Sequence, residues 1–349
     1  MSVRILFSGI LICLPHIGST QGYAGLGTQV EGFSNPDQRH PLEFPVDHGP
    51  HPNFRIEWWY LTANLNGNDG HEYGVQWTLF RTALAPDDRS GWSSPQIWMG
   101  HAGLTTPDVH HFDERMARGG IGQAGVTTHP FTAWIDNWEM ASLDRSLQNL
   151  TVTASGGRFA YNLSMSARGP LVLHGDKGYS VKSAGGQASW YYSQPSYDVT
   201  GILTISDGSV EVTGQGWLDR EWSSQPLAED QSGWDWFSLS FDSGAKMMGF
   251  ILRSDSGDFS SGTWIDSDGI ATPIQPGTFH AEPLNYTIVE GRAIPVQWKI
   301  SLPEREVSLT IQAINENSWM GTSFPYWEGP VTISGSHTGR GYLEMTGYE

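Results

Sequence analysis

The chain has 349 residues and a formal charge of −18, with 42 glycines, 20 prolines and 16 tryptophans but only 16% charged side chains. That length exceeds what one hydrophobic core usually supports, so two domains are expected. The negative charge and the lack of a basic cluster argue against nucleic acid or anionic lipid headgroups as partners, since both bind through lysine and arginine patches.

The N-terminal segment has the pattern of a secretory signal. A single positive charge at Arg4 precedes a short apolar run, Ile5–Leu14, whereas a span of the bilayer takes about 20 apolar residues. We therefore expect residues 1–21 to be a signal peptide and the protein to be periplasmic or secreted. The only cysteine, Cys13, follows an isoleucine rather than a small residue. No lipoprotein anchor is expected, and the mature chain would have no disulfide.

After a lead-in segment at residues 22–50, the pattern changes to strands. Ile56–Ala63 and Tyr73–Arg81 are β-branched and aromatic and flank the turn Asn66–Gly70, which predicts a β-hairpin. No stretch keeps a helical period, although Phe112–Arg118 or Pro226–Gln231 could form a brief helix. The class is therefore all-β. Further strand-like runs are Leu150–Ala154, Phe159–Ala167, Ser189–Tyr192, Val199–Ile205, Val210–Leu218, Phe237–Phe241, Met247–Leu252, Pro295–Ser301, Val307–Gln312, Pro330–Gly335 and Arg340–Thr346.

Two groups of motifs recur in the same order along the chain. Glu57–Leu61, which opens the first hairpin, is echoed by Asp235–Leu239 before a second hairpin, and the later run Gly214–Asp219 matches Gly339–Glu344. This order predicts duplication of one β unit. We expect two barrels, at residues 51–230 and 231–349, because a closed antiparallel barrel has no exposed edge and can hold one small ligand.

The densest polar and aromatic run is Gly216–Pro226. In a strand, Asp219 and Glu221 share one face while Arg220 points to the other. Two carboxylates on one apolar face repel each other, so one should keep a proton near neutral pH, as a general acid must. A structural arginine–carboxylate network that ties the domains together is the alternative for the same residues.

Other candidates carry weaker signals. Glu57 and Asp235 occupy equivalent places in the repeat, which favours structural roles, because catalysis usually needs one site. Tyr191 and Gln194 could steer a ligand or close a barrel, and His101 could act as a base or donor. The histidines lack metal-ligand spacing, and no phosphate loop or dinucleotide fingerprint occurs, so neither a metal site nor a cofactor is expected.

Seven motifs are specific in residue type and order: His51-Pro52-x-Phe54-Arg55-x-Glu57-Trp58-Trp59-Tyr60, Gly74-x-Gln76-Trp77-Thr78-Leu79-Phe80-Arg81, Gly169-Pro170-Leu171-Val172-Leu173, Tyr191-Tyr192-Ser193-Gln194-Pro195, Trp217-Leu218-Asp219-Arg220-Glu221-Trp222, Gly233-Trp234-Asp235-Trp236-Phe237 and Tyr326-Trp327-Glu328-Gly329. Together they resemble the lipocalin-like carotenoid 1,2-hydratase (hydroxyneurosporene synthase) superfamily, and most closely its AttH-like secreted branch. The resemblance runs from about His40 to the C-terminus. It implies a tandem lipocalin (calycin) fold with a cavity at the junction of two barrels, as in the fungal decalin-forming cyclases of this superfamily.

The resemblance also implies a chemistry. The hydratases protonate a terminal double bond and capture the carbocation with water, which suits an acid in an aromatic pocket. Their pattern at this run is Asp-His-Asn-Trp; here Asp219 and Trp222 are kept, while Arg220 and Glu221 replace the histidine and the asparagine. Since arginine does not exchange protons at ordinary pH, this branch either uses another acid or does not hydrate carotenoids.

We therefore predict a hydratase-like enzyme for a hydrophobic, unsaturated terpenoid-, carotenoid- or polyketide-like molecule. Asp219 or Glu221 would be the acid or base, and Arg220 would tune or clamp. The alternative is a periplasmic carrier that presents an apolar compound to a transporter; a structural surface protein is the third hypothesis. Carboxyls pointing into a closed cavity favour catalysis, and surface-paired carboxyls favour carriage. The predicted substrate-binding residues are Glu57, Trp58, His101, Tyr191, Gln194, Trp222, Trp234, Asp235 and Trp236.

Overall fold

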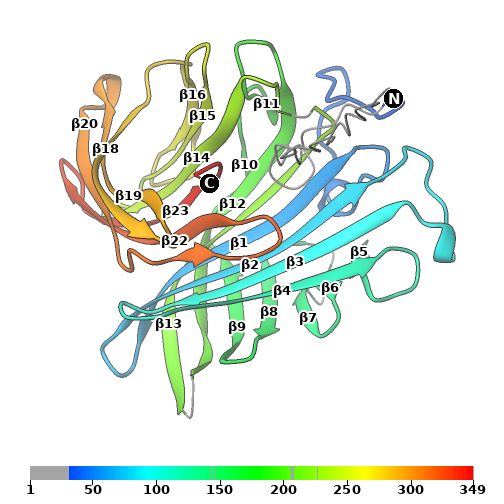
Figure 1. Cartoon of the computed structure of the whole chain (residues 1–349), viewed down its shortest axis with the longest axis horizontal. Coiled ribbons are helices and arrows are strands. Elements are labelled where there is room, and N and C mark those ends of the chain that lie inside the picture. The colour runs from blue at the N-terminus through cyan, green and yellow to red at the C-terminus, as the bar shows by residue number, and fades with distance from the viewer. Residues whose placement is uncertain (1–30, 143, 145, 206–207, 226, 349) are drawn as a thin grey trace, which may run out of the picture.

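The computed structural model describes residues 31–348 apart from 143, 145, 206–207 and 226. The predicted signal peptide, with Cys13, lies outside these described residues. The all-β prediction is confirmed: the described chain consists of antiparallel strands, their connections and the short 3₁₀ helices Val46–His48, Gly91–Ser93 and Pro303–Arg305 (Figure 1). None of the helices in this part of the chain has the length and apolar character that crossing a membrane would take.

The first sheet runs in the order β4-β3-β2-β1-β13-β12-β9-β8-β7-β6-β5, with β10 and β11 beside β12. Its strands are β1 (Ile56–Gly67), β2 (Glu72–Ala83), β3 (Gln96–Thr105), β4 (His110–Arg118), β5 (Ala124–Thr128), β6 (Phe131–Ile135), β7 (Trp138–Ala141), β8 (Asn149–Ser155), β9 (Phe159–Ala167), β10 (Val172–Leu173), β11 (Tyr179–Val181), β12 (Ala188–Ile205) and β13 (Gly208–Ser223).

The second sheet runs in the order β17-β16-β15-β14-β23-β22-β20-β19-β18, with β21 beside β22. Its strands are β14 (Gln231–Phe241), β15 (Lys246–Ser254), β16 (Phe259–Ile265), β17 (Ala271–Ile274), β18 (His280–Val289), β19 (Arg292–Leu302), β20 (Val307–Ala313), β21 (Trp319–Met320), β22 (Tyr326–Gly335) and β23 (Gly339–Met345). The first sheet thus ends at Ser223 and the second begins at Gln231, while the division into domains at residue 230 stays a prediction.

The repeated motifs occupy equivalent places in the two sheets. β1 lies between β2 and β13, and β14 lies between β15 and β23. The pairing registers differ by two residues from the sequence match, since Trp58 lies opposite Glu221 and Trp236 lies opposite Glu344. Because a shift of two residues preserves the face of a strand, Glu344 keeps the orientation that its match with Asp219 implies.

Two expectations about local structure are wrong. Phe112–Arg118 is part of strand β4, where pairing with β3 satisfies the backbone, and residues 227–230 are loop and turn rather than helix. The runs predicted at Ser189–Tyr192 and Val199–Ile205 are one strand, β12, with a bulge between Gln194 and Tyr197. The bulge accommodates the proline that separates the two runs in sequence, because a residue without an N–H fits where the ladder is already interrupted.

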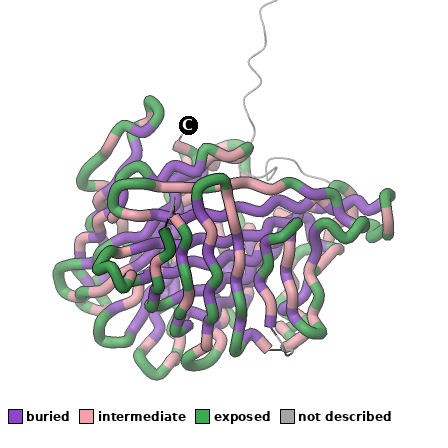
Figure 2. The backbone as a smooth tube through the Cα atoms, turned by 90° about the horizontal axis from the view of Figure 1, so that it is seen from below, coloured by how far each residue is buried: buried purple, intermediate pink, exposed green. Residues whose placement is uncertain are grey.

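Three apolar clusters organise the molecule. Each sheet surrounds a core of its own, and a third cluster joins the sheets through residues that include Tyr60, Tyr191, Trp217, Trp236 and Phe250. β22 and β23 pack against β2 and β1. Strand β1 is therefore buried on both faces, whereas β9, away from the junction, alternates between buried and exposed positions. Figure 2 shows that the exposed segments gather at the connecting turns and the buried ones within the strands.

Candidate active site

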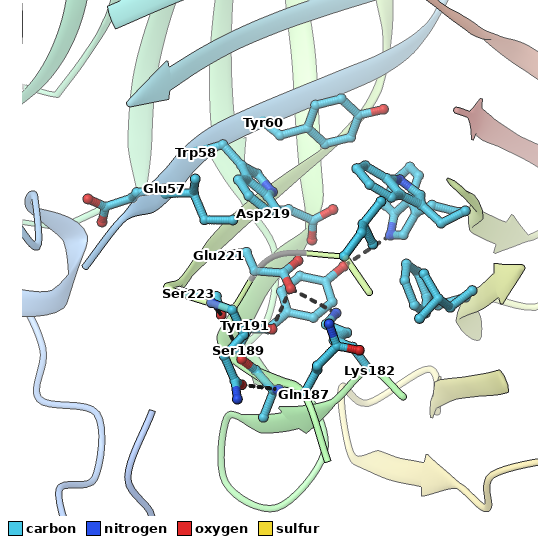
Figure 3. A pocket seen from close by; sticks show the side chains of 18 of the residues that line it. Glu57, Trp58, Tyr60, Lys182, Gln187, Ser189, Tyr191, Asp219, Glu221 and Ser223 are labelled. Atoms are coloured by element: carbon cyan, nitrogen blue, oxygen red, sulfur yellow. Dashed lines mark hydrogen bonds and ion pairs between the residues drawn. The ribbon is translucent and has the colours of Figure 1, made fainter. Parts of the chain in front are cut away.

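A pocket opens between the two sheets, beside the third apolar cluster (Figure 3). It has a volume of about 120 Å³, and its walls come from β1, β2, β12 and β13 on one side and β14, β15 and β23 on the other. The aromatic and aliphatic side chains of this lining include Trp58, Phe80, Tyr191, Leu227, Trp234, Trp236, Phe250 and Leu252.

Strand alternation decides which side chains reach the pocket. On β13, Asp219 and Glu221 line it, while Arg220 turns into the first sheet's own core. On β1, Trp58 and Tyr60 likewise line the pocket. The predicted separation of the two carboxyls from the arginine follows directly from the two-residue period of a strand.

Asp219 is a buried carboxyl surrounded by neutral hydrogen-bond donors. Its Oδ1 accepts from the Ser193 hydroxyl and from Trp217 Nε1, 2.9 Å away, whereas Oδ2 makes no hydrogen bond with the described residues. Burial raises the pKa of Asp219 to about 7. Ser193 Oγ in turn lies 2.6 Å from His174 Nε2, and His174 Nδ1 lies 2.8 Å from the Thr263 hydroxyl of the second sheet. This carboxyl can therefore hold a proton near neutral pH inside an aromatic pocket.

Glu221 stands nearer the mouth of the pocket and is ion-paired. Its Oε1 lies 2.9 Å from Lys182 Nζ and accepts a hydrogen bond from the Ser189 hydroxyl. Its side chain is 12% exposed. The ammonium group of Lys182 lies over the Tyr191 ring, 4.3 Å from its centroid. The two carboxyls on one strand face thus differ: one is buried among neutral donors and the other is paired with a cation.

The second sheet contributes a further acid to the pocket. Glu344 lines the pocket and accepts a hydrogen bond from Trp234 Nε1 at 2.8 Å. Burial, opposed by hydrogen bonds from Trp234 and Tyr60 and reinforced by the nearby charge of Asp219, raises the pKa of Glu344 to about 7. The pocket therefore places titratable carboxyls from both sheets on its walls.

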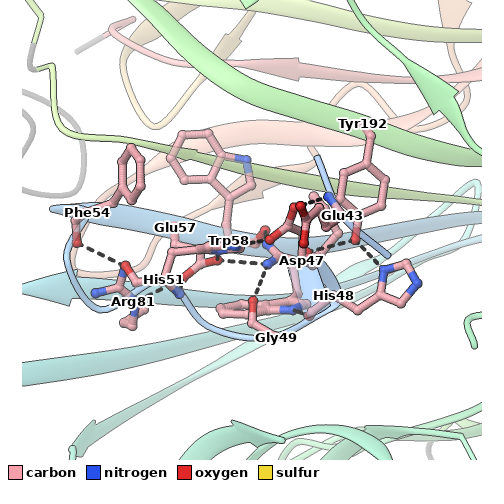
Figure 4. A network of polar contacts seen from close by, with 12 residues as sticks. Glu43, Asp47, His48, Gly49, His51, Phe54, Glu57, Trp58, Arg81 and Tyr192 are labelled. Carbon is pink, nitrogen blue, oxygen red and sulfur yellow. Dashed lines mark hydrogen bonds and ion pairs between the residues drawn. The ribbon is translucent and has the colours of Figure 1, made fainter. Parts of the chain in front are cut away.

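Arg220 and Glu57 belong to a buried network on the far side of β1 and β13 (Figure 4). Glu57 Oε1 lies 2.7 Å from Arg220 Nη2 and 2.6 Å from His51 Nδ1, and Glu57 Oε2 lies 3.0 Å from Arg81 Nε. The guanidinium of Arg220 also stacks over Trp59, 3.9 Å from the ring centroid. Burial opposes ionisation of Glu57, but the charges of His51, Arg220 and Arg81 outweigh it and hold its pKa well below the usual range.

Arg220 and Glu57 were expected in one site with Asp219 and Glu221, and the structure corrects that prediction. Figure 3 shows the Glu57 carboxylate turned away from Asp219 and Glu221, although Glu57 lies at the pocket wall. Arg220 also donates to the backbone carbonyls of Trp58 and Gly49, so both of its terminal nitrogens are taken up by the network. The arrangement matches the structural alternative for this arginine, with the difference that it ties the lead-in segment to the first sheet.

Trp222 and Asp235 are also outside the pocket, for the same reason of strand alternation. Trp222 stacks on the His51 ring with 3.9 Å between centroids and belongs to the first sheet's core. Asp235 lies 3.4 Å from Arg253 Nη1 and accepts a hydrogen bond from Tyr348. Burial raises the pKa of Asp235 to about 6. Each faces the interior of its own sheet, so neither lies where the prediction of a shared pocket put it.

Gln194 and His101 have partners elsewhere. Gln194 sits at the bulge of β12 and donates from Nε2 to the carbonyl of Gly169 at 3.1 Å. His101, on β3, is fully buried between the Tyr326 hydroxyl at 3.0 Å and Glu114 at 3.1 Å. The structure does not bring these two residues to the pocket lining.

Comparison with known proteins places the chain in a family. Residues 35–348 match the family described as AttH-like. The chain belongs to the AttH-like family. The resemblance seen in the sequence motifs is thereby confirmed. A search of curated proteins found no match.

Solved structures support the fold of this AttH-like protein. An AttH protein from Nitrosomonas europaea is 30% identical, with a TM-score of 0.81 over 90% of this chain and 99% of that one. Kievitone hydratase from Nectria haematococca is 16% identical, with a TM-score of 0.69 over 90% and 95% of the two chains. CghA is 13% identical, with a TM-score of 0.53 over 85% and 89%. At these lower identities the last two show a shared fold.

Seven predicted residues of the AttH-like protein line the pocket, and other lining residues were missed. The seven are Glu57, whose carboxylate turns away (Figure 3), and Trp58, Tyr191, Asp219, Glu221, Trp234 and Trp236. Glu344 carried a signal, because it matches Asp219 in the repeat. Tyr60 lay within a quoted motif, next to a predicted residue. Lys182 follows a short strand in a stretch without periodicity, so no sequence signal could have identified it.

Proposed function

We propose that this AttH-like protein is a hydratase-type enzyme that adds water across a carbon–carbon double bond of a hydrophobic molecule. The observation that carries the proposal is Asp219: a buried carboxyl with a pKa of about 7, on the wall of a pocket lined by Trp58, Tyr191 and Trp236. A general acid works best when its pKa lies near the operating pH. The fold likeness to kievitone hydratase supports the same reaction class.

Each step of the proposed reaction has a residue to perform it. The neutral Asp219 carboxyl gives its proton to one alkene carbon; the π electrons form the new C–H bond and leave a cation on the other carbon. The faces of Trp58 and Trp236 stabilise that cation, because aromatic rings carry negative charge on their faces. A water oxygen then bonds to the cationic carbon while its proton passes to Glu221. The product is an alcohol, Asp219 has lost one proton and Glu221 has gained one.

The substrate in this proposal is an unsaturated terpenoid- or polyketide-like compound rather than a polar metabolite. Half of the residues that line the pocket with Asp219 are aromatic or aliphatic, among them Trp58, Trp234 and Trp236. An apolar pocket with few polar groups selects hydrophobic ligands, and the polar groups fix their orientation. The absence of the hydratases' histidine at position 220 does not remove the acid, because that position faces away from the pocket and Asp219 faces into it.

The test is turnover of the natural ligand. Mass spectrometry of an organic extract of the native protein would identify the bound compound, which is then incubated with wild type, Asp219→Asn and the control Asp235→Asn. We expect Asp219→Asn to lower kcat by about 10²- to 10⁴-fold, the usual contribution of a general acid. Asp235→Asn should keep most activity, because Asp235 is a buried carboxyl of raised pKa outside the pocket.

The same experiment separates catalysis from carriage. The inward, buried position of Asp219 favours catalysis. Undiminished turnover by Asp219→Asn would refute its role as the acid. Saturable binding of the extracted compound without turnover by wild type would instead support a carrier that delivers an apolar compound to a transporter.

A further inference from the structure

A chain of buried polar groups leaves the pocket on the side of the second sheet. Glu344 and Glu328 lie directly opposite each other on β23 and β22. The Tyr60 hydroxyl of β1 donates to Glu328 Oε1 at 2.5 Å, and Tyr60 lines the pocket together with Glu344. Tyr60 is 5% exposed, Glu328 1% and Glu344 9%. A phenol from one sheet thus hydrogen-bonds one of two facing carboxyls of the other sheet.

The chain continues from Glu328 to the molecular surface. Tyr326 lies two residues before Glu328 on β22, so both side chains share one face of the strand, and the Tyr326 hydroxyl lies 3.0 Å from His101 Nδ1. On the other side of the ring, His101 Nε2 lies 3.1 Å from Glu114 Oε1. Glu114 is 21% exposed and also accepts hydrogen bonds from Ser323. Every link between the pocket and the surface is therefore a group that can both accept and release a proton.

We propose that this relay chain conducts protons between solvent and the pocket, so that the pocket acid regains its proton after each turnover. The inference rests on the proposed function and extends it to residues outside the pocket. The relay chain consists of Glu344, Tyr60, Glu328, Tyr326, His101 and Glu114.

The proton balance of hydration explains the need for such a path. Each turnover removes a proton from Asp219 and adds one to Glu221. Glu221 stands near the mouth beside Lys182 and can release its proton to solvent there. Asp219 lies deeper, 2% exposed, and a bound apolar ligand would separate it from the mouth. The relay chain supplies a proton at Glu344, and the water that enters as co-substrate passes it to Asp219.

The protonation states suit conduction. Burial keeps the pKa of Glu328 well above its usual range and that of His101 below it, so near neutral pH one is a carboxylic acid and the other a neutral imidazole. A protonated Glu328 can donate to Tyr326, Tyr326 to His101 Nδ1, and His101 Nε2–H to Glu114. The reverse set of hops carries a proton inward.

Stability alone does not account for these groups. Two carboxyls opposite each other on neighbouring buried strands repel when ionised, and each must otherwise be kept neutral at the cost of its hydration. An apolar pair at the positions of Glu328 and Glu344 would pack the junction without that cost. Their retention at a pocket wall is consistent with a functional role.

The experiment follows hydrogen–deuterium exchange of the Glu328 carboxyl by infrared spectroscopy. Well above pH 7 the exposed carboxyls are ionised, and so are Asp219 and Glu344, whose pKa values are about 7. The carbonyl band of protonated Glu328 then stands alone, and Glu328→Gln identifies it. The full-length variants are Tyr60→Phe, which cuts the pocket side, Tyr326→Phe, which cuts the surface side, and the double variant. The control is a second double variant, Tyr60→Phe with Tyr197→Phe. Tyr197 is as buried as Tyr326, and its hydroxyl donates to the Leu147 carbonyl away from the relay chain.

Glu328 can exchange through the pocket side or the surface side of the relay chain, and these two routes predict the order of the exchange rates. Each single variant should still exchange through the intact side, while the double variant should exchange about tenfold or more slowly, because a phenyl ring neither donates nor accepts. His101→Gln in the Tyr60→Phe background provides a second surface-side cut and should slow exchange as well. Equal exchange rates in Tyr60→Phe and in both of these double variants would overturn the relay.

The outcome is independent of the substrate. If wild type turns over no extracted compound, the proposed function fails, yet the exchange pattern still decides whether the relay chain conducts protons. If turnover is found, Tyr326→Phe should lower kcat while leaving KM unchanged, whereas the control Tyr197→Phe should alter neither. An unchanged kcat in Tyr326→Phe would exclude the relay chain from catalysis.

Discussion

Two buried carboxyls of this protein, Asp219 and Glu57, have opposite protonation behaviour. Both are almost completely buried and lie three strand positions apart across β1 and β13, on opposite faces. Glu57 is surrounded by Arg220, Arg81 and His51, which hold it ionised. Asp219 has only the neutral donors Ser193 and Trp217, so burial raises its pKa. The identity of the partners, rather than burial itself, decides which carboxyl can act as an acid.

The raised pKa makes a prediction about stability. The folded protein binds the Asp219 proton more tightly than the unfolded chain, whose pKa is near 3.8. The free energy of unfolding should therefore fall as pH rises from about 4 to about 7. Asp219→Asn removes this loss while keeping the acceptor oxygen. Relative to wild type, the variant should gain roughly 2–3 kcal/mol between about pH 5 and about pH 8.

Urea unfolding of wild type and Asp219→Asn at both pH values measures this difference. The gain should grow with pH because only wild type must ionise Asp219, while the other buried carboxyls are common to both proteins. A difference that stays constant across the range would mean that Asp219 is already ionised at the lower pH, and the proposed acid would lose its basis.

At the scale of elements, strand β13 serves two sites at once. Its pocket face carries Asp219 and Glu221, and its other face carries Arg220 and Trp222 in the first core. The two-residue period separates a surface suited to a ligand from a network that holds the lead-in segment, through Gly49 and through the Asp47 carboxylate paired with His51. The residues of this one polar motif therefore belong to two separate sites, the pocket and the buried network.

This separation predicts the effect of Arg220→Met. Removing one partner of a buried ion pair leaves the other charge uncompensated, so the free energy of unfolding should fall by about 3–5 kcal/mol. Arg168→Met is the matched control: Arg168 pairs with Asp198, but their side chains are 69% and 54% exposed, so the loss should stay below about 1 kcal/mol. Urea unfolding gives both values.

Ligand binding distinguishes a structural from a catalytic arginine. Under conditions where Arg220→Met remains folded, its affinity for the extracted compound should match wild type. Weakened binding together with unchanged stability would instead show that Arg220 acts in the ligand pocket.

For the whole molecule, the site exists because two sheets meet. Trp236, from the second sheet, contacts the Tyr60 ring edge-on at 5.3 Å and donates from Nε1 to the Tyr191 hydroxyl at 3.1 Å, both on the first sheet. His174 and Thr263 form a further hydrogen bond between the sheets. Neither sheet alone provides the pocket or the relay chain.

Trp236→Ala should therefore weaken the whole junction. Loss of this buried ring should lower the free energy of unfolding by about 3–5 kcal/mol, the range for large core truncations. The control Trp92→Ala removes a ring that is 75% exposed and should change stability by less than about 0.5 kcal/mol. Calorimetry should show the junction variant melting earlier or in two separated transitions. A single transition at the wild-type temperature would show that the sheets hold together without Trp236.

Much of the fold and part of the site follow from local sequence. The all-β class, the hairpin around Asn66–Gly70 and the opposite orientations of Asp219 and Arg220 rest on turn chemistry and on the two-residue period of strands, which need no knowledge of distant contacts. The repeat also indicated that Glu344 corresponds to Asp219. Each of these features can be predicted from a few neighbouring residues or from the order of the motifs along the chain.

Tertiary structure alone decided which strand faces meet. The pocket pairs β1 and β13 with β14 and β23, and the choice of Asp219 over Glu57 as a neutral acid depends on charges brought in by Arg81 and His51. The relay chain links Tyr60 to Glu328, which lies 268 residues further along the chain. Alternation specifies that a strand has two faces, but packing between distant strands determines what each face touches, and that packing sets burial, partners and protonation.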